Sequence, residues 1–231
     1  MALLLSLETS THSFSCALHR DSKLIAFEES LVPQSTASLL AVMIENLFSI
    51  SDTSKNDLNA VVVASGPGSY TGLRIGVATA KGICFVLNIP LVSVNTLSLM
   101  VHQFVKEHSQ HELQNSILCS MLDARRMEVY CLQADARGTI IEQTQAKVID
   151  ENSFADQLER QAIYFFGEGS DKCKNVIHHG NAKFVSGLRP SASSLGEMGF
   201  KKLLANDFEN ISFFEPFYLK DFVIKKPKSV S

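Results

Sequence analysis

Ser65-Gly-Pro-Gly-Ser-Tyr-Thr-Gly-Leu-Arg-Ile-Gly-Val-Ala-Thr-Ala-Lys-Gly82 is the most informative segment of the chain, because it places several glycines where a predicted strand is followed by a predicted helix. Residues 60–64 before it are apolar and mostly β-branched, which predicts a buried strand. Gly66-Pro-Gly68 is typical of a turn, and we expect the helix to begin near Ser69 or Thr71.

The glycines inside the predicted helix need a compensating reason, because each costs about 1 kcal/mol relative to alanine. One reason is phosphate binding: a glycine-rich turn offers free N–H groups and the positive end of the helix dipole, and Arg74 could add charge. The other is close packing, because Gly72, Gly76 and Ala80 recur every four residues and form a smooth stripe for another helix. Local sequence alone leaves both interpretations open.

Known phosphate-binding patterns do not match this stretch. The spacing Gly66-x-Gly68-x-x-x-Gly72 is one residue too long for the dinucleotide pattern G-x-G-x-x-G, and no Gly-Lys-Ser/Thr follows to make a P-loop.

Composition predicts a globular chain. Its 231 residues are 45% hydrophobic, enough for a sizeable core in one large domain or two small lobes. The net charge of -3 gives no general attraction for nucleic acid, so such binding would need a local basic patch. The C-terminal tail has such a basic patch at Lys220, Lys225, Lys226 and Lys228. Four lysines of this kind are more typical of a solvated terminus than of a nucleic-acid site.

Cysteine usage and the N-terminus both favour a cytoplasmic location. The five cysteines are odd in number, widely spaced and without a C-x-x-C pair, so we expect reduced core residues. Leu3-Leu-Leu5 lacks the basic leader of a signal peptide. No uncharged apolar run approaches the roughly 20 residues of a membrane span, so we expect a soluble, cytoplasmic chain.

The chain begins with a predicted three-strand meander over 2–7, 14–18 and 24–27. Ser35 or Thr36 then caps a helix to about Phe48. Its apolar residues span an arc of about 180° at roughly 100° per residue: Leu39, Leu40, Met43, Ile44, Leu47 and Phe48. Half of that arc can cover a sheet, and the rest indicates either a partner surface or a helix buried within its domain.

Strands and helices then alternate, which predicts an α/β fold with mixed sheets. Strands are expected over 60–64, 89–94, 117–122 and 128–134, and helices over about 70–87, 96–108 and 193–204. A second sheet is expected to begin near Ile117.

Candidate catalytic chemistry is sparse. Glu8-Thr-Ser-Thr11 could hold Mg²⁺ and phosphate where the first strand turns back, or it is a polar hairpin turn. The chain has His108-x-x-His111 and His178-His179 but no H-x-x-x-H pair and no G-x-S-x-G elbow. The charged segment 123–126 could form a polar site, and we favour a charged hairpin turn.

Several motifs follow one another along nearly the whole chain: Leu5-Ser-Leu-Glu-Thr-Ser-Thr11, Phe14-Ser-Cys-Ala-Leu18, the glycine-rich stretch 66–82, Asp123-Ala-Arg-Arg-Met-Glu-Val-Tyr130 and Pro216-Phe-Tyr-Leu-Lys220. In this order they resemble the TsaB (YeaZ) family. The resemblance implies a two-lobed actin-like (ASKHA, ribonuclease H-like) fold, each lobe a mixed sheet flanked by helices. It also implies a role in adding threonylcarbamoyl to the N6 of the adenosine beside the anticodon of tRNAs that read codons starting with A.

The resemblance implies that this chain is a scaffold and no catalyst. The catalytic paralogue, TsaD, carries an H-x-x-x-H metal site, whereas this chain has Gln34-Ser-Thr-Ala-Ser38 in the comparable helix. We therefore expect no catalytic residue, metal or intrinsic cofactor here, with ATP and metal on partner subunits. The implied partners are TsaD, the ATPase TsaE in the assembled complex, a second copy when TsaD is absent, and tRNA only through the complex, with no membrane.

The implied partner interface lies on the first two helices, and close packing then outweighs phosphate binding for the glycine stripe. The expected interface residues are Leu39, Leu40, Met43, Ile44, Leu47, Gly72, Leu73, Gly76, Val77 and Ala80. On this hypothesis Gly76→Arg would break association and leave the monomer folded. A vestigial phosphate site would comprise Glu8, Thr9, Ser10, Gly66, Gly68 and Ser69.

Three departures from the family pattern bear on these expectations: Glu8 stands where Asp is usual, Tyr70 where Phe is common, and Lys220 where Arg is common. The longer carboxylate weakens the case for a nucleotide site in this chain. The alternative function is an independent nucleotide-hydrolysing enzyme of the actin-like superfold that uses Glu8, Thr9 and residues 66–69.

The expected domains are an N-terminal actin-like lobe over 1–100 that carries the dimerisation helices, a smaller lobe over 101–190, and a tail over 206–231. The helix near 193–205 is expected to complete the first lobe.

Overall fold

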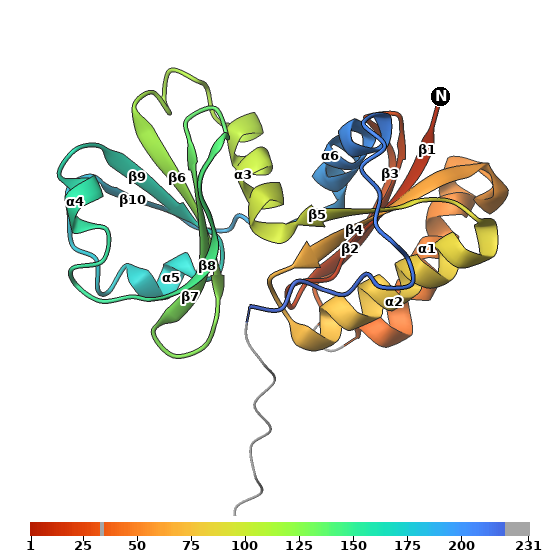
Figure 1. The fold of residues 1–231 in the computed structure, drawn as a ribbon, viewed down its shortest axis with the longest axis horizontal. Helices are drawn as coiled ribbons and strands as arrows, with labels where there is room; N and C mark the ends of the chain where they lie inside the picture. Colours follow the sequence, from red (N-terminus) through yellow and green to blue (C-terminus); the bar gives the residue numbers. More distant parts are fainter. Residues whose placement is uncertain (33–34, 220–231) are drawn as a thin grey trace, which may run out of the picture.

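The computed structural model describes residues 1–32 and 35–219, which form two lobes side by side (Figure 1). Each lobe is built on a five-stranded mixed sheet. The polypeptide passes from the first lobe to the second through β5 and α3, and returns to the first lobe in α6.

The first sheet has the strand order β3-β2-β1-β4-β5. β1 pairs antiparallel with β2 and parallel with β4. Leu5 shows the register, since it lies between Leu18 and Val61 and all three are fully buried. The strands are β1 (Leu3–Glu8), β2 (Phe14–Arg20), β3 (Lys23–Ser30), β4 (Leu58–Gly66) and β5 (Leu91–Asn95).

Helices cover both faces of the first sheet. α1 (Thr36–Ser51) and α2 (Tyr70–Leu87) lie on one face, and α6 (Ala192–Leu204) lies on the other (Figure 1). A short 3-10 turn, η1 (Lys55–Asp57), leads into β4. Alternating strand residues therefore feed two apolar layers, one under α1 and α2 and one under α6.

The second sheet has the order β10-β9-β6-β7-β8, with β6, β7 and β8 forming an antiparallel meander. α3 (Thr96–Glu107) packs against β6. The other elements are β6 (Ser116–Asp123), β7 (Glu128–Asp135), β8 (Ile140–Val148), α4 (Ala155–Leu158), β9 (Ala162–Phe166), α5 (Ser170–Cys173) and β10 (Ala182–Val185).

A C-terminal strap, residues 206–219, runs back along the first lobe to the junction of the lobes (Figure 1). The Glu209 amide donates to the Leu91 carbonyl at 2.9 Å, and Lys81 Nζ donates to the Phe214 carbonyl at 3.1 Å. Near its end the Phe217 amide donates to the Ser65 carbonyl at 2.7 Å. The strap is therefore fixed to β5, α2 and the end of β4.

The predicted α/β class, the meander and the start of a second sheet are confirmed. Three strands were not predicted: β8, β9 and β10. β8 carries the polar run Glu-Gln-Thr-Gln at 142–145 and forms an edge of the sheet, so it lacks the apolar alternation of a half-buried strand.

The wide apolar arc of α1 does not indicate a second partner surface. Leu40, Met43, Ile44, Leu47 and Phe48 are all buried in the core of the first lobe, where α1 contacts β2, β3 and α2. The other interpretation, a helix buried within its own domain, is the one that the structure supports for these residues.

α2 is long and apolar enough to cross a membrane by length and composition alone. In this fold α2 lies on the first sheet and buries one face, which includes Leu73, Val77, Ala80 and Cys84.

Candidate functional site

The glycine stripe of α2 packs against the β1–β2 loop of the same chain. A Cβ on Gly72 would fall within 3.0 Å of the Thr9 carbonyl oxygen, and one on Gly76 within 3.0 Å of Thr9 Oγ1. A Cβ on Gly68 would meet the Ser10 carbonyl oxygen equally closely. Close packing does explain these glycines, but the prediction that another helix lies on them is wrong.

The expected interface residues lie inside the first lobe. Leu39 is half-buried, and the other nine are buried: Leu40, Met43, Ile44, Leu47, Gly72, Leu73, Gly76, Val77 and Ala80. The nine buried residues therefore offer little surface to a partner in the folded chain, whereas Leu39 is partly accessible. Gly76→Arg is no test of association, because its side chain would collide with Thr9 inside the monomer.

The outer face of α1 and α2 is a different set of residues and remains accessible. Large apolar side chains stand exposed there: Phe85 is 79% exposed, Val86 78%, Ile50 64% and Val42 53%. The two helices are neighbours on one face of the sheet (Figure 1). Large exposed apolar side chains on two neighbouring helices are a feature of protein interaction surfaces.

The expected phosphate site is closed by the chain's own backbone. The Ser69 amide, which would face a phosphate, donates to the Ser10 carbonyl at 2.6 Å. Ser69 Oγ accepts a hydrogen bond from the Gly72 amide at 3.3 Å. Glu8 and Thr9 are fully buried beneath this contact, so only part of the predicted set lines open space. The predicted set therefore does not form a site for a nucleoside triphosphate.

Glu8 is an isolated carboxyl group in the core. Its Oε1 accepts hydrogen bonds from the Ser10 amide and the Ser10 hydroxyl, both at 2.5 Å, while Oε2 has no partner among the described residues. Burial outweighs these hydrogen bonds and raises the pKa of Glu8 to about 7. The group is therefore largely protonated below neutral pH.

Glu8 is expected to make stability depend on pH. The pKa of Glu8 is about 7 in the folded chain and 4.5 in the unfolded chain. The free energy of unfolding therefore falls as the pH rises between these two values. The loss amounts to about 3 kcal/mol. Urea unfolding of Glu8→Gln and wild type at about pH 5 and about pH 8 should show a flatter dependence in the variant. Parallel curves would contradict this assignment.

A cleft of about 510 Å³ opens between the lobes. Ser10, Gly68 and Ser69 line its first-lobe side, and the β6–β7 turn lines the other. The end of the strap forms a third side, where the rings of Tyr70 and Tyr218 lie 5.1 Å apart.

A larger cavity of about 970 Å³ lies across the strap from this cleft, since Phe217 and Tyr218 line both. Two pairs of its polar groups bond to each other: the Ser93 hydroxyl donates to Glu209 at 2.5 Å, and Lys202 donates to the Ser93 carbonyl at 2.9 Å. The strap thus divides the space between the lobes in two.

The β6–β7 turn holds Arg125 and Arg126 in left-handed backbone conformations, with φ values of 70° and 48°. Both arginine residues are exposed. Lys172 Nζ anchors the turn by donating hydrogen bonds to Asp123 Oδ1, the Arg126 carbonyl and the Glu128 carbonyl at 2.6 to 2.7 Å. The predicted charged hairpin turn is therefore confirmed, and its anchor, Lys172, is a residue that the sequence did not reveal.

Lys172→Ala is expected to lower the free energy of unfolding by about 2 kcal/mol, because hydrogen bonds to charged groups contribute about 1.5–3 kcal/mol. Lys174→Ala is the matched control, since Lys174 lies two residues away and pairs with the exposed Asp171. Urea denaturation should show a clear loss for the first and little change for the second. Equal losses would show that Lys172 does not anchor the turn.

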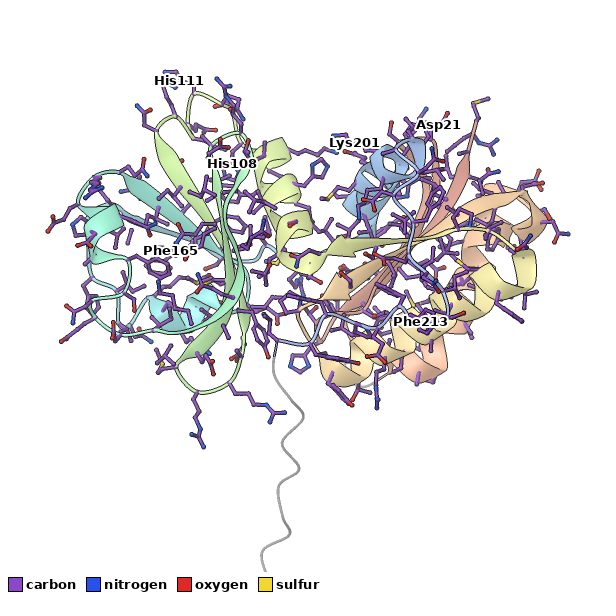
Figure 2. The ribbon with its side chains drawn as sticks, in the orientation of Figure 1. Asp21, His108, His111, Phe165, Lys201 and Phe213 are labelled. Atoms are coloured by element: carbon purple, nitrogen blue, oxygen red, sulfur yellow. The ribbon has the colours of Figure 1, made fainter. Side chains whose placement is uncertain are left out.

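No group of three or more His, Cys, Asp or Glu is placed to hold a metal within residues 1–32 and 35–219. Figure 2 shows His108 and His111 just past the end of α3 and in the following loop. All five cysteines are buried and free, and burial raises the pKa of Cys16 to about 12. The four tail lysines, Lys220, Lys225, Lys226 and Lys228, lie outside the described residues.

Residues 31–228 match the family model of TsaD, tRNA N6-adenosine threonylcarbamoyltransferase. A tRNA threonylcarbamoyladenosine biosynthesis protein TsaB from Bacillus subtilis is 28% identical over 88% of this chain and 89% of that protein. The Escherichia coli TsaB protein is 32% identical over 55% of this chain and 52% of its own length.

Solved structures agree on the fold. A Pseudomonas aeruginosa protein described as similar to peptidase YEAZ superposes with a TM-score of 0.80 at 22% identity, over 95% of this chain and all of that one. YeaZ from the same species gives a TM-score of 0.74. The predicted two-lobed fold, with a mixed sheet flanked by helices in each lobe, is thus confirmed. The chain belongs to the family that the TsaD model describes and, within it, to the TsaB (YeaZ) proteins of tRNA threonylcarbamoyladenosine biosynthesis.

Proposed function

We propose that this chain is the non-catalytic partner subunit of the complex that adds threonylcarbamoyl to the N6 of the adenosine beside the anticodon. The observation that carries the proposal is the closed phosphate site. The Ser69 amide, which would face a phosphate at the start of α2, is bonded to the Ser10 carbonyl and is not open to a triphosphate. A chain with this fold that does not bind a nucleotide can still act as a scaffold, because its surface can bind a partner subunit.

The accessible face of α1 and α2 supports the choice of partner. Phe85, Val86, Val42 and Ile50 present an apolar surface that a second actin-like chain with similar helices could cover. On this proposal the catalytic paralogue TsaD binds there, and a second copy takes the same place when TsaD is absent. TsaE joins the assembled complex, ATP and metal belong to the partner subunits, and tRNA is modified only by the complex.

The alternative is an independent nucleotide-hydrolysing enzyme that uses Glu8 and Thr9. It needs these groups to reach a bound phosphate, whereas both side chains are buried beneath the Ser69 contact with Ser10.

The test follows tRNA modification by the purified paralogue and its other partners with and without this chain. We expect modification to require the chain and to survive Glu8→Gln in it. Calorimetric titration of the isolated chain with ATP should show no binding. ATP hydrolysis by the isolated chain that is lost in Glu8→Gln would instead establish the independent enzyme.

A further inference from the structure

The cleft between the lobes concentrates the chain's tyrosines. The chain has four tyrosines, and Tyr70, Tyr130 and Tyr218 line this one cleft from three separate elements: α2, β7 and the strap. The Arg74 guanidinium lies 4.6 Å from the centroid of the Tyr70 ring, on which it stacks. The Tyr218 ring is more than a third exposed beside Tyr70. One side of the cleft is therefore aromatic, with Arg74 stacked on Tyr70 and with Tyr218 accessible to a ligand.

Arginines flank the same wall. Arg125 lines the cleft and the exposed Arg126 follows it in the turn. The carboxylate of Asp123 is compensated by Lys172, 2.7 Å away, which leaves Glu168 as the acidic group of the lining without an ion pair among residues 1–32 and 35–219. The guanidinium groups therefore outweigh the carboxylates around the opening.

Tyrosine rings with flanking arginines suit unpaired nucleotides. Bases stack on aromatic faces, guanidinium groups take the phosphates in bidentate fashion, and the pattern tolerates any base sequence. The volume of about 510 Å³ is within the range of sites that enclose a small ligand. A free nucleoside triphosphate is disfavoured, because the amide that would hold its phosphates is bonded to Ser10.

We propose that this cleft binds a single-stranded stretch of RNA, with bases against Tyr218 and Tyr130 and phosphates on Arg125 and Arg126. The inference rests on the proposed function, which brings tRNA to the complex. It goes beyond that function by giving this chain its own contact with the RNA. Glu168 supplies a carboxylate acceptor of the kind that a ribose 2′-hydroxyl can bind, a group that DNA lacks.

The test measures binding of a fluorescein-labelled hairpin RNA with an unpaired loop, by fluorescence anisotropy, to the full chain alone and to its mixture with the paralogue. Arg125→Ala/Arg126→Ala should weaken binding about tenfold or more and reduce the slope of log affinity against log salt by about 1.4. Tyr218→Leu should weaken binding about 5- to 100-fold with the salt slope unchanged. The matched control is Arg137→Ala/Arg160→Ala, which removes the same charge from exposed positions outside the cleft lining and should bind as wild type.

Several outcomes would overturn the proposal: wild-type affinity in both cleft variants, equal binding of a fully paired RNA, displacement of the RNA by stoichiometric ATP, or no RNA binding by chain and mixture alike. Light scattering on the same samples reports association with the paralogue. Loss of association in the cleft variants would identify a protein contact instead. If the cleft variants associate normally but bind RNA like wild type, the RNA site is refuted and the partner role is not. If the wild-type chain itself fails to associate with the paralogue, the partner role is refuted.

Discussion

Gly72→Ala is expected to destabilise the chain by about 3 kcal/mol, at the upper end of the usual cost of overpacking a core. The added methyl group would lie within 3.0 Å of the Thr9 carbonyl oxygen, closer than real Cβ atoms come to such a neighbour. Thr9 follows β1 directly, and β1 is paired on both sides. Neither the helix nor the loop can move away without disturbing the centre of the first sheet.

Gly82→Ala is the matched control in the same helix. A Cβ at Gly82 meets nothing within 4 Å, so this substitution should stabilise the helix by about 1 kcal/mol. Urea unfolding of both variants, checked by circular dichroism, measures the difference. If Gly72→Ala were as stable as Gly82→Ala, α2 would not be packed on the β1–β2 loop as described.

Phe85→Asp is expected to weaken association with the catalytic paralogue by 100-fold or more, an effect of about 3 kcal/mol that is typical of an aromatic hot spot. The side chain is 79% exposed in the free chain, so its loss should leave folding unchanged. A charge placed in the middle of a desolvated helical contact would remain without a partner.

Leu204→Asp is the control for this experiment, because Leu204 is 68% exposed on α6, which covers the opposite face of the first sheet. Association measured by sedimentation velocity should fall only for the Phe85 variant. If Leu204→Asp weakened the complex and Phe85→Asp did not, the partner would bind the α6 side of the lobe.

The sequence revealed much of the fold, because apolar runs and glycine turns are local signals. The glycine stripe shows where that approach stops. Spacing established that something comes close to Gly72 and Gly76, but the neighbour is Thr9, which is distant along the chain. Small residues in a helix predict that another segment packs closely on it, but they do not identify that segment.

The candidate sites show the same division. The charged turn could be predicted from its residues, but Lys172, which holds it, reaches the turn from α5. The meeting of Tyr218 with Tyr70 depends on the strap and has no local signal. The apolar arc of α1 was visible, yet only the packed fold separates its buried residues from the exposed Val42 and Ile50.

The most direct test of the central claim is the molar mass, by light scattering, of an equimolar mixture of this chain and the catalytic paralogue, in the presence and absence of ATP. We expect one species with the summed mass of the two chains, together with no ATP binding by this chain alone. Two separate species, with tight ATP binding by the isolated chain, would contradict the scaffold role and favour an independent nucleotide-hydrolysing enzyme.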